Sequence, residues 1–142
     1  MAHSKTKALS RVPLFSKLSK SELEFVAGNA DEVDVKAGQK LTTQGSPGDS
    51  FYVLLDGEAV VEIDGEKRRT LKAGDFFGEI SMLDRGPATA TVRTKTDSRV
   101  LVMSHSQFRD TIKASDGLLV KVLTAMGERL RADLAKAQHH RK

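Results

Sequence analysis

Short segments in the middle third of the chain alternate apolar and polar residues, as half-buried strands do. Within residues 58–63, for example, Val61 and Ile63 would face one side of a strand and their neighbours the other. Glycines separate these segments, and Asp64-Gly65 suits a hairpin turn because both residues tolerate positive φ. Closely spaced strands joined by glycine turns are typical of a β-sandwich or a barrel-like roll. We expect strands at residues 32–36, 39–43, 50–55, 58–63, 69–72, 88–94 and 99–104.

The two ends of the chain show a helical pattern instead. Ser19 followed three residues later by Glu22 predicts a capping box at the start of a short helix. Residues 104–114 form a second candidate helix, and residues 116–138 form a longer third one. The third has apolar residues at helical spacing: Leu119, Val122, Leu123, Met126, Leu130 and Leu134. Helices that are grouped apart from the strands indicate an α+β fold.

Composition narrows the class of protein. The length of 142 residues suits one domain. Because the chain has no cysteine, disulfide scaffolds, thiolate metal sites and cysteine nucleophiles are excluded. The net charge of +4 comes from scattered Lys and Arg, so we expect no direct nucleic-acid binding. No apolar run approaches the ~18 residues that span a membrane, and the first residues lack the apolar core of a secretory signal, so we expect a cytoplasmic protein.

The histidines do not form a catalytic or metal-binding set. His3, His139 and His140 lie near the ends of the chain, and His105 is alone at a strand–helix junction. A metal-dependent β-barrel enzyme would need about three ligating side chains on its strands. None of the expected strands contains a histidine. We therefore expect no catalytic residue, no metal ligand and a non-enzymatic function.

The clearest chemical pattern lies in residues 77–92. Residues 78–83 can form one or two helical turns, and a helix that begins at a glycine such as Gly78 presents unpaired N–H groups to an anion. Glu79, in the first turn, could accept hydrogen bonds from the hydroxyls of a sugar. Small residues on both sides of the turn would let a ligand approach the backbone. The pattern fits a site for a phosphorylated polyol, and it also fits an ordinary turn between strands.

Two motifs in this segment resemble the phosphate-binding cassette of cyclic-nucleotide-binding domains. They are Phe-Gly-Glu-Ile-Ser at residues 77–81 and Gly-Pro-Ala-Thr-Ala-Thr-Val at residues 86–92. Residues 36–58 resemble the first β-hairpins of the same family. The likeness extends from Val12 to Leu134, which is nearly the whole chain.

The resemblance implies a fold and its bounds. It implies an α+β domain built on an eight-stranded antiparallel β-roll, jelly-roll-like in outline. N-terminal helices and C-terminal hinge and lid helices would flank the roll. The domain would occupy residues 12–138, with an N-terminal tail at residues 1–11 and a C-terminal tail at residues 139–142.

The ligand that the resemblance implies is cAMP or cGMP. Glu79 would accept the ribose 2′-hydroxyl, and the backbone of residues 88–90 would close on the cyclic phosphate. Thr89 could add its hydroxyl to the phosphate, or favour guanine over adenine. The residues implied in the ligand site are Phe77, Gly78, Glu79, Ile80, Ser81, Ala88, Thr89 and Ala90.

One residue departs from the family's pattern. The cassette of the family carries an arginine directly after the proline, where this chain has Ala88. A hydrogen bond to a charged group contributes ~1.5–3 kcal/mol, so its loss predicts ~10–150-fold weaker binding. Arg85 in the loop and Arg129 on the last helix are candidate substitute cations. Asp133 is a candidate contact to the base.

Three functions stay open on the sequence alone. The chain could be a regulatory module that binds cAMP or cGMP weakly. It could be a degenerate domain that binds no nucleotide and acts in protein interaction or regulation, or it could bind a different small molecule. In a switch, the ligand would favour one position of the helix at residues 116–138. That helix could contact an effector domain or a second copy of the chain in a homodimer.

Overall fold

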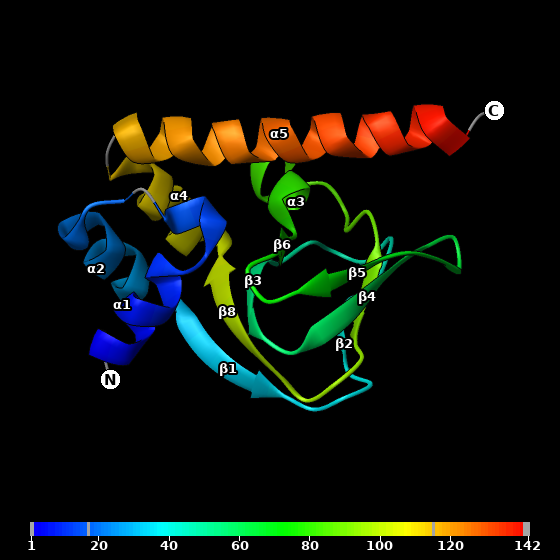
Figure 1. Cartoon of the computed structure of the whole chain (residues 1–142), viewed down its shortest axis with the longest axis horizontal. Helices are drawn as coiled ribbons and strands as arrows, with labels where there is room; N and C mark the ends of the chain where they lie inside the picture. The colour runs from blue at the N-terminus through cyan, green and yellow to red at the C-terminus, as the bar shows by residue number, and fades with distance from the viewer. Residues whose placement is uncertain (1, 17, 115, 141–142) are drawn as a thin grey trace.

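Eight antiparallel strands form two four-stranded sheets that close into a roll (Figure 1). The computed structural model describes residues 2–16, 18–114 and 116–140, with side chains for residues 6–16, 18–114 and 117–136. The strands are β1 (Asp31–Val35), β2 (Lys40–Thr42), β3 (Ser50–Asp56), β4 (Glu58–Ile63), β5 (Glu66–Lys72), β6 (Phe76–Phe77), β7 (Thr91–Thr94) and β8 (Ser98–Ser104). Their order is β1-β8-β3-β6 in one sheet and β2-β7-β4-β5 in the other. The predicted eight-stranded antiparallel roll is confirmed.

Helices cover one end and one side of the roll. They are α1 (Ala2–Ser10), the short 3₁₀ helix η1 (Pro13–Phe15), α2 (Lys20–Gly28), α3 (Glu79–Asp84), α4 (His105–Lys113) and α5 (Asp116–His140). Helices α1, α2 and α4 gather at one end, and α5 runs along one side and passes over α3 (Figure 1). The segment 1–11, which we expected to be a tail, contains α1, and Leu9 of this helix is fully buried. A single apolar anchor in a nine-residue helix gives little periodicity, so the sequence pattern did not reveal it. The expected C-terminal tail also differs, because α5 continues to His140; residues 141–142 lie outside the described part of the chain.

Local sequence signals fix the ends of several elements. Asp64 and Gly65 adopt φ angles of 54° and 79° in the β4–β5 turn, as a hairpin of this type requires. Ser19 accepts a hydrogen bond from the backbone N–H of Glu22, whose side chain accepts one from Ser19, so the predicted capping box is present. A second capping box, which starts at Ser104, opens α4.

The strand predicted at residues 88–94 is shorter than expected. Regular pairing begins only at Thr91, because the residues before it pair with a loop instead of a strand. The Ala88 N–H donates to the carbonyl of Ser46, and the Ala88 carbonyl accepts from the N–H of Gly45. The two-residue strand β6 was not predicted, since two residues carry no alternation.

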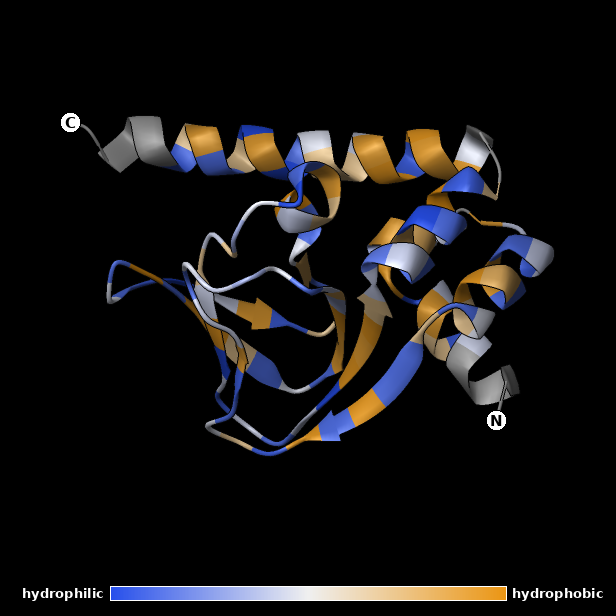
Figure 2. Ribbon diagram, turned by 180° about the vertical axis from the view of Figure 1, so that it is seen from behind, coloured by the Kyte–Doolittle hydropathy of each residue, from blue (hydrophilic) through white to orange (hydrophobic). Residues whose placement is uncertain are grey.

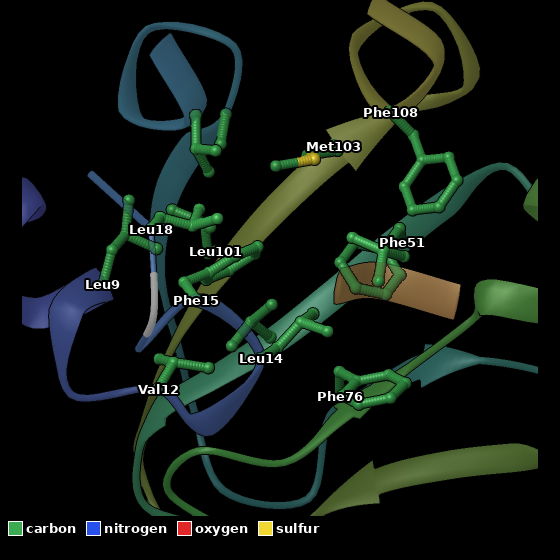
Figure 3. Packing of buried hydrophobic residues seen from close by; sticks show 14 of the residues in the cluster. Leu9, Val12, Leu14, Phe15, Leu18, Phe51, Phe76, Leu101, Met103 and Phe108 are labelled. Atoms are coloured by element: carbon green, nitrogen blue, oxygen red, sulfur yellow. The ribbon is translucent and has the colours of Figure 1, made fainter. Parts of the chain in front are cut away.

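Two apolar clusters hold the roll and its helices together. The first packs the N-terminal helices, α4 and the start of α5 against the β3–β8 sheet, with Phe51 in contact with Phe76 and Phe108 (Figure 3). The second lies inside the roll, between the sheets, and includes Phe77 and Val92. Removing apolar surface from water contributes ~25 cal/mol of free energy per Å², so these clusters are the main source of stability. The second cluster also supports the site described below.

Helix α5 is only partly packed on the rest of the molecule. Its first half buries Leu118 and Val122, whereas Leu130 and Leu134 are 59% and 55% exposed. The predicted apolar stripe therefore packs mainly over its N-terminal part, although apolar residues recur along the helix (Figure 2). Within the part of the chain that the structure describes, we find no helix with the length and apolar character needed to cross a membrane.

Candidate functional site

The segment after β6 turns sharply because Gly78 adopts a left-handed conformation. Its φ is 88°, and it caps the N-terminus of α3. A Cβ atom at this position would lie 2.4 Å from the carbonyl oxygen of Ser50, so only glycine fits without a backbone shift. Helix α3 ends at Arg85, whose φ is 58° and whose N–H donates to the carbonyl of Ser81. The turn and short helix predicted from the sequence are thus present.

One cavity of about 310 Å³ lies between this turn and the β-roll. Its size is at the lower end of the range for small-molecule sites, ~300–1,000 Å³. The structure brings all the residues of the predicted ligand site to its wall: Phe77, Gly78, Glu79, Ile80, Ser81, Ala88, Thr89 and Ala90. Of the other candidates, Arg129 and Asp133 also line the cavity. Arg85 does not; it is exposed and lies in a separate shallow depression beside His105.

Apolar side chains of the roll form one wall of the cavity. Val61, Ile63 and Val92 face it from β4 and β7. Phe77 stacks on Tyr52 with ring centroids 4.7 Å apart and an interplanar angle of 9°. The Tyr52 hydroxyl donates to the carbonyl of Leu41 at 3.0 Å. Burial raises the pKa of Tyr52 above its ordinary value, a shift that a hydrogen bond to Ser50 partly opposes. Tyr52 lies behind Phe77 and outside the cavity lining, so the wall that a ligand would meet consists of Phe77 and the aliphatic side chains.

The opposite wall is made by the cassette backbone, which is tightly packed. The Ser81 hydroxyl is buried and donates to the carbonyl of Pro87 at 3.3 Å. Gly48 lies directly against it, since a Cβ atom there would come within 2.1 Å of Ser81 Oγ. The Ala88 N–H donates to the carbonyl of Ser46 at 2.8 Å. This donor is thus bonded within the protein, and a phosphate could use it only by breaking the bond to Ser46.

Glu79 and Arg129 face each other across the mouth of the cavity. Arg129 Nη1 lies 3.8 Å from Glu79 Oε1, and both side chains are less than one fifth exposed. Arg129 also donates to the carbonyl of Phe76, and its guanidinium lies 4.6 Å from the centroid of the Phe76 ring. Burial lowers the pKa of Arg129, and Glu79 opposes that shift. Arg129 thus joins α5 to the roll beside the carboxylate that we expected to bind ribose.

A second ion pair between α5 and the roll also lines the cavity. Arg69 Nη1 of β5 lies 2.7 Å from Asp133 Oδ1 of α5. Arg69 was not among the predicted site residues. Arg69 lies two residues before the buried Leu71 in the same strand. Because alternate residues of a strand face the same side, this spacing could have placed Arg69 on the inner face of the roll.

The described residues contain no group of three or more His, Asp or Glu side chains placed to hold a metal ion. His105 Nε2 lies 2.8 Å from the carbonyl oxygen of Gly48, outside the cavity. The cavity combines an apolar wall with two carboxylates, Glu79 and Asp133, and two guanidinium groups, Arg69 and Arg129.

A closed antiparallel roll with a glycine turn and a short helix over its cavity defines a class of ligand-binding β-roll domains. Residues 32–115 match the family described as cyclic nucleotide-binding domain, and this stretch is more than half of the chain. The chain therefore belongs to the cyclic nucleotide-binding domain family.

Known relatives agree with this assignment. The chain is 38% identical over 103 residues to the cAMP-dependent protein kinase regulatory subunit of Emericella nidulans, which covers 71% of this chain and 25% of that protein. The chain therefore spans about a quarter of the length of the curated relatives it matches. Among solved structures, PKAR CBD2 bound to Sp-2Cl-cAMPS superposes with a TM-score of 0.70 at 26% identity, over 89% of this chain and 94% of that one. The Thermus thermophilus catabolite activator protein shares the fold, with a TM-score of 0.78 at 24% identity over 90% of this chain and 63% of that one.

Proposed function

We propose that the chain is a regulatory module that binds cAMP or cGMP in the cavity between the cassette and the roll. The observation that carries the proposal is the convergence of residues 78–81 and 88–90 on one cavity, with Glu79 at its mouth. Membership of the family and the cAMP-dependent regulatory subunits among its relatives support a cyclic purine nucleotide as the ligand.

Each part of the cavity suits one part of such a nucleotide. Glu79 would accept the ribose 2′-hydroxyl, and the apolar wall around Val61 and Val92 would pack on the purine. Binding is expected to be weak, because Ala88 has no side-chain donor for the phosphate and its amide is already bonded to Ser46. Arg129 is the better substitute cation of the two predicted ones, since it lines the cavity and Arg85 does not.

Calorimetric titration with cAMP and with cGMP tests the proposal. The wild-type protein should bind at least one of them, and Ala88→Arg should raise the affinity about 10-fold or more by restoring a charged donor. Ala73→Arg is the matched control, because it adds the same charge at an exposed position outside the cavity. The proposal fails if the wild-type protein shows no binding at millimolar nucleotide. If Ala73→Arg strengthens binding as much as Ala88→Arg, the effect is one of net charge and the assigned phosphate position is wrong.

Helix α5 is the element through which a bound ligand would act. It contributes both Arg129 and Asp133 to the cavity, so a ligand that displaces either contact changes how α5 docks on the roll. A ligand shifts that balance only by binding one docked state more tightly than the other. The exposed apolar residues on the outer side of α5 would then engage an effector domain or a second copy of the chain: Val120, Leu123, Leu130 and Leu134.

A second candidate function is a nucleotide-free interaction module. Two observations favour it: the Ala88 amide is already bonded to Ser46, and the Glu79 carboxylate is already paired with Arg129. In this case α5 would keep the same outer apolar surface without control by a ligand. The titration separates the two functions, since this module would bind neither nucleotide even after Ala88→Arg.

A further inference from the structure

A loop between β2 and β3 fastens the cassette from outside the cavity. It comprises residues 45–48 and pairs with the cassette backbone through two hydrogen bonds. The N–H of Gly45 donates to the carbonyl of Ala88 at 2.9 Å, and the N–H of Ala88 donates to the carbonyl of Ser46 at 2.8 Å. Because both backbone groups of Ala88 are bonded to this loop, the loop fixes the start of the segment 88–90 that lines the cavity.

The loop itself is held by side chains at its two ends. Residues 43–47 are exposed, so burial contributes little to holding them in place. At one end, the side chain of Gln44 exchanges hydrogen bonds of 2.8 and 3.0 Å with Asp64 in the β4–β5 turn. At the other end, the carbonyl oxygen of Gly48 lies 2.8 Å from Nε2 of His105, the first residue of α4. His105 thus links the loop to the helices at the end of the roll.

Gly48 touches the cassette as well as His105. A Cβ atom at Gly48 would lie 2.1 Å from Ser81 Oγ and 3.2 Å from the carbonyl oxygen of Gly86. Ser81 is buried and lines the cavity. Packing this close leaves no room for Gly48 to move without a change in the cassette. The place in which His105 holds Gly48 therefore also determines how the cassette packs.

The second ring nitrogen of His105 lacks a partner. A carbonyl oxygen only accepts hydrogen bonds, so Nε2 carries the proton in the bond to Gly48. Nδ1 is buried and has no hydrogen-bond partner among the residues that the structure describes. A buried polar atom without a partner costs free energy, and proteins carry such costs mainly at functional positions. The bond from Nε2 to Gly48 is the polar contact that this histidine supplies.

We infer that His105 is a positioning residue for the phosphate end of the proposed site. It holds Gly48, and the loop that ends at Gly48 holds Ala88. The inference rests on the proposed function, which assigns the phosphate to residues 88–90. A backbone that is already ordered spares the ligand the free energy of ordering it. Because His105 lies outside the cavity, it acts on cAMP and cGMP alike and contacts neither.

Amide hydrogen exchange of the full chain without nucleotide tests the link to the loop. His105→Met removes the donor, so exchange at Gly45 and Ala88 should become about 2- to 10-fold faster, the factor expected for one lost hydrogen bond. His105→Gln should restore the wild-type rates, because the amide nitrogen of glutamine can take the place of Nε2. The amide of Lys95, which is bonded to Glu58 at the other end of β7, should keep its rate in both variants.

Titration with cAMP and with cGMP tests the consequence for the site. His105→Met should weaken both nucleotides by the same factor of about 2 to 10, and His105→Gln should restore the affinity. Ser106→Met is the matched control, since Ser106 is the exposed neighbour of His105 on α4. It should change neither amide exchange nor affinity.

The outcomes separate this inference from the proposed function. If the wild-type protein binds nucleotide but His105→Met leaves exchange or affinity unchanged, only the positioning role is overturned. Tighter binding by His105→Met also overturns it, because the loop would then compete with the phosphate for the Ala88 amide. If the wild-type protein binds neither nucleotide, both proposals fail. Circular dichroism shows whether His105→Met is folded; should it not be, His105→Asn replaces it, since the shorter amide cannot reach Gly48, and the same outcomes decide.

Discussion

Replacing Arg129 by methionine tests whether this residue fastens α5 to the roll. Methionine keeps an unbranched side chain of similar length and removes the charge and the hydrogen-bond donors. The substitution takes away three contacts: the hydrogen bond to the carbonyl of Phe76, the position over the Phe76 ring and the ion pair with Glu79. We expect a loss of folding stability and a looser α5.

The magnitude follows from these contacts. A hydrogen bond from a charged donor contributes about 1.5–3 kcal/mol, and a partly desolvated cation–π contact about 0.5–2 kcal/mol. The ion pair with Glu79, at 3.8 Å, adds less than about 1 kcal/mol. Because the contacts share one side chain they do not add fully, and a loss of about 2–4 kcal/mol in the free energy of unfolding is expected. That exceeds the effect of an average substitution, which is about 1 kcal/mol.

Urea unfolding followed by circular dichroism measures this loss. Arg131→Met is the control, because Arg131 is an exposed arginine two residues further along the same helix. Its substitution should change the free energy of unfolding by less than about 0.5 kcal/mol. If the two variants unfold alike, Arg129 does not hold α5 to the roll, and the lid role of this helix loses its physical basis.

Two further predictions concern Tyr52, which stacks on the cavity residue Phe77, and the outer side of α5. Tyr52 is the only tyrosine, so an absorbance titration reports on it alone, and its pKa in the folded protein should exceed the unfolded value of about 10. The stability that this shift contributes should be lost as pH rises through the folded pKa. Tyr52→Phe should remove that pH dependence. The exposed residues Val120, Leu123, Leu130 and Leu134 are spaced three, seven and four residues apart and so lie on one coiled-coil seam, whose middle position is Gly127. Sedimentation velocity should therefore show self-association. Leu130→Glu should abolish self-association, whereas Ala135→Glu should not, because Ala135 is exposed but lies off the seam. A monomeric wild-type protein would contradict self-association and leave an effector domain as the partner of this surface.

The parts of the site that lie close together in the sequence were the parts that could be predicted. Gly78 and Glu79 belong to one turn whose geometry is set by local chemistry, chiefly the left-handed glycine. The capping box at Ser19 and the hairpin at Asp64-Gly65 were predictable for the same reason. Nothing in those signals depends on where the rest of the chain folds.

The partners that complete the site come from distant segments. Arg129 and Asp133 were named as candidates through the family resemblance, whereas Arg69 was missed. Arg69 lies in a run of three basic residues, which indicates a solvated surface by composition, yet strand alternation turns it to the interior. The distribution of contacts along α5 depends on which of its residues meet the roll. For this reason the predicted stripe included Leu130 and Leu134, which are exposed. Arg129, which precedes Leu130, is instead buried against Phe76.

The two ion pairs that dock α5 are also the polar groups that face the cavity, and this links affinity to the position of the helix. In the proposed complex, a ribose hydroxyl at Glu79 would compete with Arg129, and a ligand group that reaches Arg69 would compete with Asp133. Each competition weakens one contact between α5 and the roll unless the ligand replaces it. Because linkage is reciprocal, any partner that draws α5 away from the roll must change nucleotide affinity by the same factor as the nucleotide changes affinity for that partner. The four side chains of these ion pairs therefore both face the proposed ligand site and dock α5 on the roll.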